Sequence, residues 1–365
     1  MKRNLGLIAS GLILSCSLVL ATDNLDEAFK SGTVSGSLET YGIHTKKSGT
    51  NLDEGMLTGT VGLGFETASY NGFTGKVAFL GAHVFAENHN GAADVESSAM
   101  LTEANIRYET NNSMFKVGRQ ELNLEWLQDY HEAFIAETSA LENTSILVGF
   151  SNRIAFADAD ELSDGFQRIN NTKGIYVVDA IYTGIADFEL NPYYYNAPDL
   201  SQLYGMKARY YMDNVEFEAQ YAISNEKANS GFEDGSIFHL KADAEVLGAA
   251  VSLGYVKTNK DGAGSIISDL ELGDNINPFE DGKYVYDLDA RTIYASATYG
   301  IGDISLTALY GETKYEDNKE KELNLSSEIE IIDDVLEVGL LFVNVDAQDS
   351  NDDYQKYIIE VEYSF

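Results

Sequence analysis

An alternation of apolar with polar or small residues is the sequence feature that most constrains this fold. It follows a short polar lead, Asp23 to Lys30, and continues to the C-terminus. Successive side chains of a β-strand point to opposite faces, so the pattern predicts strands with one apolar and one polar face. Only 3 prolines interrupt the 365 residues. We therefore predict a single all-β domain over residues 22–365.

Individual segments show the two faces directly. In the segment 57–66 the apolar face carries Leu57, Val61, Leu63 and Phe65, and the other carries Thr58, Thr60, Gly62, Gly64 and Glu66. The segment 100–109 is assigned in the same way. Its apolar face would hold Met100, Ala104, Ile106 and Tyr108, and its polar face Glu103, Asn105, Arg107 and Glu109.

The connectors between these segments form two classes that alternate along the chain. Short ones are rich in turn residues, as in Tyr70-Asn71-Gly72 and Glu142-Asn143-Thr144. Longer polar ones lie between them, namely 45–56, 86–98, 158–172, 225–235 and 258–288. Short turns at one end and long loops at the other are typical of outer-membrane β-barrels. Counting in this way predicts an antiparallel transmembrane barrel of about eighteen strands, with periplasmic turns, extracellular loops and both termini at the turn end.

The first 21 residues have the three parts of a secretory signal peptide. Lys2 and Arg3 precede an apolar run from Leu5 to Leu20, and Ala21 offers a small residue for cleavage. The run is short for a membrane helix of about 20 residues. Cys16 is the only cysteine, and a lipoprotein would be cleaved before it, but Leu14 fits that signal poorly. We expect residues 1–21 to be removed, which leaves the mature chain without a thiol.

The charge balance limits the partners. The chain has 59 Asp and Glu against 24 Lys and Arg, a formal net charge of −35. This excess argues against nucleic acid and permits cations. No later apolar run could span a bilayer as a helix, so an inserted chain must close as a barrel, in which every backbone polar group is paired. Composition alone leaves a soluble secreted β-protein open.

The C-terminal strand ends on an aromatic residue after regular alternation. Its apolar positions are Tyr357, Ile359, Val361, Tyr363 and Phe365. This pattern resembles the assembly signal of outer-membrane barrels, which implies the barrel assembly machinery as a partner. It also supports export across the inner membrane into the outer membrane of a Gram-negative bacterium.

Two blocks, together with the architecture, resemble the OprD-like porins, in particular the Opr-type porins of campylobacter-like bacteria. "AFKSGTVSGSLETYG" (28–42) resembles the first strand of that family, and Gly118-Arg119-Gln120 in "VGRQELNLEWLQDYHEAF" (117–134) resembles the segment before its pore-constricting third loop. The resemblance covers the mature chain. The family usually has Asp-x-Arg and a proline at this loop. Here Asp129-Tyr130-His131-Glu132 stands there, so the basic residue is missing or replaced by His131, and a preference for carboxylate-bearing solutes is not carried over.

A barrel of about eighteen strands is wide enough to hold an aqueous channel. An inward-folded loop is its natural constriction, and we assign this role to the segment from Glu121 to His131. The candidate constriction residues are Glu121, Glu125, Asp129, His131 and Glu132.

Charges on the polar strand faces would line the channel and set its selectivity. The basic candidates are Lys76, Arg107, Lys116, Arg153, Lys207, Arg209, Lys241 and Arg291. The acidic candidates are Glu39, Glu66, Glu103, Glu109, Glu216 and Glu218, and Glu189, Glu328, Glu330, Glu337, Glu360 and Glu362 share their face. Opposed tracks would orient dipolar solutes and favour cations. The alternative is that these charges pair across strands and have no role in solute passage.

Sites for catalysis or cofactors are poorly supported. The chain has 5 histidines and neither Gly-x-Ser-x-Gly nor His-Glu-x-x-His, so we predict no enzyme, catalytic residue, metal centre or cofactor. Acidic loop clusters at Asp158, Asp160, Glu161 and Asp164, and at Asp346, Asp349, Asp352 and Asp353, have oxygen ligands that suit Ca²⁺. They lack the EF-hand pattern, so solvated loops are favoured over a calcium site.

Taken together, these features predict an outer-membrane porin that lets small polar solutes and ions diffuse through an acidic, cation-preferring lumen. Its partners would be these solutes, outer-membrane lipid and lipopolysaccharide, with monomer and homotrimer both left open. The alternative is a structural or adhesive surface barrel that acts through its loops.

Overall fold

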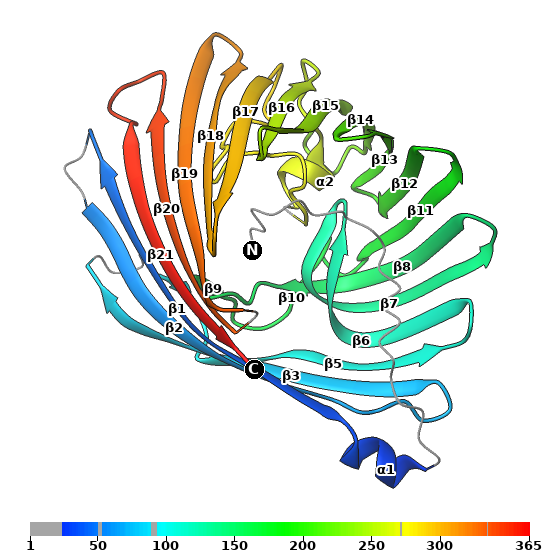
Figure 1. Cartoon of the computed structure of the whole chain (residues 1–365). Helices are drawn as coiled ribbons and strands as arrows, with labels where there is room; N and C mark the ends of the chain where they lie inside the picture. The colour runs from blue at the N-terminus through cyan, green and yellow to red at the C-terminus, as the bar shows by residue number, and fades with distance from the viewer. Residues whose placement is uncertain (1–23, 50–52, 89–92, 271, 334) are drawn as a thin grey trace.

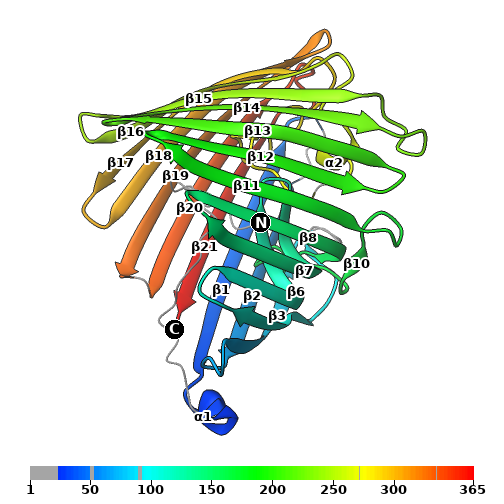
Figure 2. The same ribbon diagram turned by 90° about the vertical axis from the view of Figure 1, so that its right-hand side faces the viewer.

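The computed structural model describes residues 24–49, 53–88, 93–270, 272–333 and 335–365. Figures 1 and 2 show its long strands arranged side by side around a central space. The eighteen long strands are β1 (Thr33–Lys47), β2 (Asp53–Glu66), β3 (Phe73–Glu87), β5 (Ala99–Glu109), β6 (Ser113–Leu124), β7 (Leu127–Leu141), β8 (Thr144–Ala155), β11 (Ile175–Ile185), β12 (Phe188–Ala197), β13 (Ser201–Met212), β14 (Val215–Glu226), β15 (Gly235–Val246), β16 (Ala249–Thr258), β17 (Arg291–Ile301), β18 (Ile304–Tyr315), β19 (Asn318–Ile332), β20 (Leu336–Asp346) and β21 (Tyr354–Ser364).

The remaining elements are short. Of the two helices, α1 (Leu25–Lys30) precedes the first strand, and α2 (Ser265–Ser268) lies within the longest loop. Three two-residue strands lie in loops: β4 (Asp94–Val95), β9 (Glu161–Leu162) and β10 (Gln167–Arg168). No helix of the described residues has the length and apolar character needed to cross a membrane. The predicted signal peptide, residues 1–21, lies outside the described residues.

Pairing of the first and last long strands closes the sheet. β1 pairs antiparallel with β2 on one side and with β21 on the other, from Ser37 opposite Ser364 to Lys47 opposite Tyr354. The backbone N–H of Phe365 donates to the Gly36 carbonyl at 3.0 Å. The predicted closed antiparallel barrel of eighteen strands is therefore confirmed.

The short connectors are tight turns that match the twist of their strands. Tyr70 and Phe73 exchange backbone hydrogen bonds of 2.9 and 3.0 Å across Asn71 and Gly72. Both central residues have positive φ, 53° and 85°, the conformation in which Asn-Gly is favoured. The opposite, loop end is less uniform than predicted, because residues 125–126, 198–200 and 316–317 also form tight connections there.

The wall has an apolar outer face and a polar inner face, as the alternation predicts. On β2, Val61 and Leu63 are more than half exposed on the outside, whereas Thr58 and Thr60 are buried on the inside. The prediction that Met100 lies on the outer face is wrong, because Met100 is buried against Ala157 and Leu162 inside the barrel. The pairing of β3 with β5 shifts register between Ala78 and Phe79, and such a bulge turns the following side chains to the other face.

The candidate functional site: the interior of the barrel

The β6–β7 hairpin carries the predicted constriction residues. β6 pairs with β5 only as far as Arg119, while β6 and β7 stay paired to Leu124 opposite Leu127. The segment from Glu121 to His131 was predicted to be an inward-folded loop, and this prediction is corrected. The segment consists of the end of β6 and the start of β7, joined by Glu125 and Trp126. β6 has no pairing with β5 beyond Arg119, and β7 is paired with β8 only from Tyr130 onward, so residues 122–129 form a hairpin tip that pairs with neither neighbouring strand.

The tip of this hairpin reaches a distant part of the wall. The Glu125 carboxylate forms an ion pair with Lys207 of β13 and accepts a hydrogen bond of 2.8 Å from Gln220 of β14. The Trp126 backbone N–H donates to the Tyr195 hydroxyl at 3.3 Å. The side chains of Glu125 and Lys207 are 3% and 5% exposed, so neither charge is open to passing solute.

The loop between β16 and β17, residues 259–290, also folds into the barrel (Figure 1). Gln128 of the hairpin donates to Asn275 at 2.5 Å, and Asn275 donates to the Glu125 carbonyl at 3.2 Å. Ile266, Ile267, Leu272, Ile276 and Phe279 pack in one buried cluster with Leu122, Leu124, Trp126 and residues of the wall. The sequence pattern predicts only a polar connector over residues 258–288, and the apolar residues within it are the signal for its inward fold.

Polar contacts hold the far end of this loop against the opposite wall. Glu322 of β19 accepts hydrogen bonds from the backbone N–H groups of Asp281 and Gly282, at 3.1 and 3.0 Å. Asp281 pairs with Lys356 of β21 and accepts a 2.7 Å hydrogen bond from Tyr354. Within the loop, burial and the nearby Asp274 charge raise the pKa of Tyr286 well above its ordinary value. Tyr286 therefore stays protonated and donates to Asp274.

A third segment, residues 156–174, covers part of the inner wall. Thr58 of β2 donates to the Ala159 carbonyl at 2.5 Å. Leu162 and Phe166 pack with Ala82 and Met100 of β3 and β5. Three segments that are distant in sequence thus narrow the interior.

A pH-dependent contact lies in this third segment. β9 pairs in parallel with β4, with Glu161 opposite Asp94. Burial first, and then the Asp94 charge, raises the pKa of Glu161 from 4.5 to about 7. The folded form therefore holds the proton more tightly than the unfolded form, and the contact should weaken as pH rises between these values. Amide protection factors across residues 156–166 should fall with rising pH, and Glu161→Gln should flatten that dependence. An equal pH dependence in the variant would contradict this assignment.

His131 does not face the interior space. It is fully buried, and its ring nitrogens lie 2.8 Å from the Ser151 hydroxyl and 2.6 Å from the Gln128 carbonyl. The ring is therefore not available as the basic residue of a constriction, which was one of the two alternatives for this segment. The basic group there is Arg119, whose guanidinium lies 4.4 Å from the Phe166 ring centroid and contacts Glu132 at 3.1 Å. In the sequence, the only signal for Arg119 is its place in the Gly118-Arg119-Gln120 block.

Most of the predicted basic residues do lie on the inner face, each beside an acid. Arg107 contacts Glu109 at 2.9 Å, and Arg153 contacts Glu132 at 3.3 Å. The other pairs are Lys76 and Lys116 with Glu103, Arg209 with Glu189, Glu216 and Glu218, and Lys241 with Asp243. The prediction that Arg291 lines the interior is wrong. Arg291 shares the outer face of β17 with Ile293, while Thr292 between them is fully buried.

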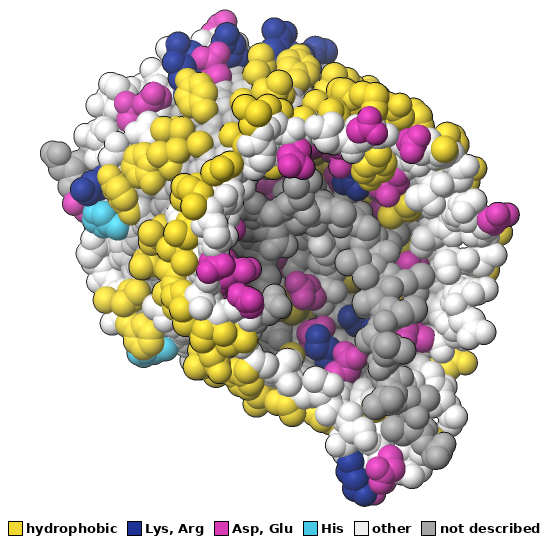
Figure 3. All heavy atoms as spheres, in the orientation of Figure 1, with side chains coloured by type: hydrophobic (Ala, Val, Ile, Leu, Met, Phe, Trp, Pro, Cys, Tyr) yellow, Lys and Arg dark blue, Asp and Glu magenta, His cyan; other side chains and the backbone are white. Residues whose placement is uncertain are grey.

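Six glutamates on the inner face form what we call the glutamate wall. Four of them stand in one row across adjacent strands, where Glu330 pairs with Glu337, Glu337 with Glu362, and Glu362 with Glu39. Glu328 and Glu360 lie two residues from this row. Among the described residues no Lys, Arg or His lies within salt-bridge distance of Glu328, Glu337 or Glu360. Figure 3 shows acidic and basic side chains lining the central hollow. Glu66 lies at the same end of β2, on its inner face.

The interior offers little for catalysis or metal binding. Ser151 and His131 share a hydrogen bond but are both 0% exposed, so a substrate could not reach the hydroxyl. In the part of the chain that the structure describes, no three His, Cys, Asp or Glu side chains are grouped to hold a metal ion. The absence of a cofactor and of calcium at the loops stays a prediction.

Comparisons with known proteins agree with this architecture. A family model described as "Putative outer membrane protein" matches residues 45–225. No curated protein matches the sequence. Among solved structures, Pseudomonas aeruginosa OccK8 (OprE) is 12% identical, and the match covers 93% of this chain and 99% of that protein, with a TM-score of 0.75. Pseudomonas aeruginosa OpdK with vanillate is 13% identical, and the match covers 92% of this chain and 99% of that protein, with a TM-score of 0.77. Acinetobacter baumannii OccAB4 is 12% identical, and the match covers 91% of this chain and 98% of that protein, with a TM-score of 0.74.

The expected resemblance to OprD-like porins is thus confirmed in the fold, over nearly the whole barrel. The family model that matches residues 45–225 is described as an outer-membrane protein, and the apolar outer face suits a surrounding bilayer. This chain therefore has the fold of the OprD-like porins, a closed antiparallel β-barrel of eighteen strands, and its residues 45–225 match a family model of outer-membrane proteins.

Proposed function

We propose that the barrel is a passive channel for small polar solutes and ions, with a preference for cations. The glutamate wall is the observation that carries the cation preference. Its carboxylates face the interior from four adjacent strands, and most of the basic side chains on the inner face are already paired with acids. A surplus of one charge on low-dielectric walls raises the local concentration of counter-ions.

We further propose that the constriction is a composite of the β6–β7 hairpin and the loop 259–290. The contacts of Gln128 and Glu125 with Asn275 support this assignment. Since Glu125 is neutralised by Lys207, the charges closest to passing solute in this region are Glu121, which is exposed, and the half-buried Asp129 and Glu132. The constriction would then restrict size, and the glutamate wall would determine charge preference.

The adhesive alternative is less well supported by the loops. The longest loop, 259–290, packs its apolar residues inside the barrel, where they could not contact another cell or surface. Recognition of the C-terminal strand by the assembly machinery, contact with lipopolysaccharide and assembly as a homotrimer remain proposals. The outer face of β21 has the alternation that such recognition would read, with Tyr357, Ile359 and Phe365 exposed.

Neutralising the glutamate wall tests the cation preference. In the triple variant Glu328→Gln, Glu337→Gln, Glu360→Gln, the reversal potential under a salt gradient should move toward zero, because three unpaired interior carboxylates are lost. A matched variant, Glu142→Gln, Glu233→Gln, Asp317→Asn, removes three exposed charges from turns and loops and should leave it unchanged. Planar-bilayer recording measures both. Equal reversal potentials in wild type and triple variant would refute the role of the wall, and a reconstituted barrel that passes no current would refute the channel.

A further inference from the structure

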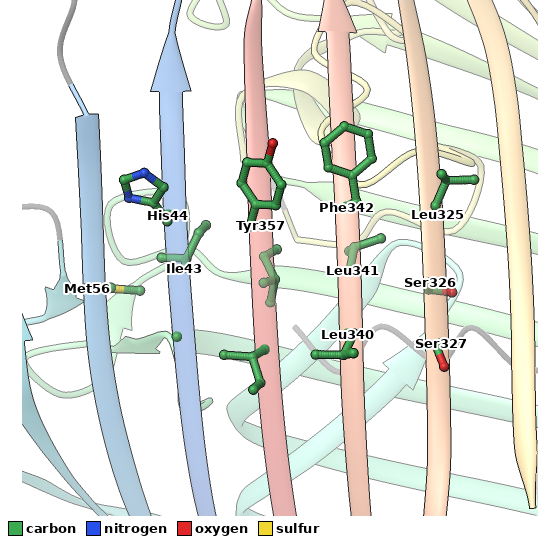
Figure 4. Close-up of a pocket in the computed structure, with 13 residues that line it drawn as sticks. Ile43, His44, Met56, Leu325, Ser326, Ser327, Leu340, Leu341, Phe342 and Tyr357 are labelled. Carbon is green, nitrogen blue, oxygen red and sulfur yellow. The ribbon is translucent and has the colours of Figure 1, made fainter.

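The outer face of the barrel carries a groove that the channel does not use. It has a volume of about 610 Å³ and crosses β19, β20, β21 and β1. Figure 4 shows Leu325, Leu340, Phe342, Tyr357 and His44 along it. Leu325, Leu340 and Tyr357 are each more than 40% exposed, so the groove opens outward and not into the interior.

Small residues create this groove among larger neighbours. Gly42 stands on the outer face of β1 between Ile359 and Leu57, and a Cβ atom there would lie 3.0 and 3.3 Å from their side chains. Ser327 pairs with Leu340 and leaves a second gap on β19. The walls are hydrocarbon, and the open shape between them fits an extended acyl chain better than a flat lipid annulus.

The groove lies in the half of the barrel nearest the loops. His44 is three residues from the end of β1 at Lys47, and Tyr357 is three residues from the start of β21 at Tyr354. Because the long loops face outward in such barrels, this half lies in the outer leaflet. The occupant would therefore come from the lipid of that leaflet.

A cation stands at the loop end of the groove. Lys46 follows His44 on the outer face of β1, and its ammonium lies 5.6 Å from the centroid of the Tyr357 ring. Among the described residues Lys46 has no ion pair, although Asp53 is its cross-strand neighbour on β2. Lys47, on the inner face, is instead paired with Glu54 at 2.8 Å. An exposed ammonium above a hydrocarbon groove matches a lipid that carries phosphate above its acyl chains.

A second groove on the outer face provides a comparison within the same molecule. It has a volume of about 490 Å³ and runs past Phe188, Phe217 and Leu253. Phe188 and Phe217 lie near the turn-side starts of β12 and β14, so this groove faces the inner leaflet. Arg209 and Lys241 belong to the strands that line this groove, but their charged groups are paired with acids of the inner face. The second groove is therefore apolar like the first, but none of its described lining residues is an outward-facing cation that corresponds to Lys46.

From these observations we infer that the groove between β19 and β1 binds a phosphorylated, multiply acylated lipid of the outer leaflet. One acyl chain would lie over Gly42 and Ser327, and a phosphate would contact Lys46 and the His44 ring. This inference deepens the proposed contact with lipopolysaccharide and rests on the outer-membrane location, but it does not depend on the proposed cation preference.

Native mass spectrometry of the intact barrel in detergent, titrated with phosphorylated lipid A, tests the inference. Lys46→Gln should weaken binding about tenfold, the effect of losing one charge-assisted contact. Ser327→Phe should also weaken it, because the ring fills the groove while keeping the surface apolar. Two matched controls should bind as wild type. Lys314→Gln removes an outward rim lysine that is already paired with Glu312, and Ala242→Phe fills the second groove.

The possible results separate the explanations. Equal binding by wild type and Lys46→Gln, or equal binding of lipid A after its phosphates are removed, would overturn phosphate recognition. A change of oligomeric state in Ser327→Phe, with lipid binding unchanged, would assign the groove to a second copy of the chain and overturn the proposal. Single-channel conductance is recorded on the same samples, because both substitutions lie outside the interior. Loss of current in all of them would count against the channel and leave the lipid result standing.

Discussion

Excising residues 265–285 should raise the single-channel conductance several-fold. The excision is geometrically feasible, because the Ala263 N–H donates to the Tyr286 carbonyl at 3.2 Å, so a short Gly-rich turn can join the two sides. It removes the buried apolar residues and the Asp281 contacts that fill the space between the hairpin and the wall. Conductance follows the open cross-section, so a wider interior passes more current.

Two further variants sharpen this prediction. Shortening the exposed loop 227–234 removes residues from the loop end without touching the buried cluster, and should leave the conductance unchanged. Asp281→Asn keeps the whole loop but weakens its ion pair with Lys356, and should produce more frequent current fluctuations at nearly the same mean conductance. If the excised barrel conducts like wild type, the loop does not limit the flow, and the hairpin alone would have to do so.

The second large effect is expected for Glu125→Gln. This substitution removes the Glu125 carboxylate from the buried Lys207 ammonium, and breaking a buried ion pair from one side costs roughly 3–5 kcal/mol. The hairpin tip should then detach from the wall. Trp126 is the only tryptophan of the chain and is 1% exposed, so its fluorescence should shift to longer wavelength and become open to quenching.

A double variant shows whether the charge imbalance is the cause. Adding Lys207→Met to Glu125→Gln removes both charges, and replacing both partners of a buried pair is often nearly neutral. The emission should then return close to that of wild type. Glu121→Gln, on an exposed position of the same hairpin, serves as the control and should leave the emission of Trp126 unchanged. A wild-type spectrum in Glu125→Gln itself would show that the ion pair does not hold the tip.

Local regularity explains why the wall was predictable. On β14, the alternation of Phe217 and Tyr221 with Glu218 and Gln220 is the direct record of a strand between two media, and the structure follows it. β7 is a strand with weak alternation. It carries Glu137 on the inner face, where Ser145 donates to it at 2.8 Å, and its other end leaves the wall as a hairpin. A strand that is partly buried on both faces loses the simple alternation.

Register irregularities explain the residues that were assigned to the wrong face. Met100 precedes a bulge that a strict period of two cannot represent, so it faces inward. The alternation predicts Arg291 on the inner face, but the structure puts its neighbour Thr292 there, buried and paired with Val256 of β16. A polar residue at the rim of a barrel is compatible with either face, because water is present on both sides at that height. Hydropathy therefore contains no information about its direction.

By itself the sequence determined the class of fold, the number of strands, the direction of the chain and the acidity of the interior, because each of these depends on residues close together along the chain. Only the tertiary structure decided what occupies that interior. The contacts of Glu125 with Lys207, of Gln128 with Asn275 and of Asp281 with Lys356 join residues 75 to 147 positions apart. Such contacts depend on which strands face each other across the closed ring, and a repeat with a period of two residues cannot specify them.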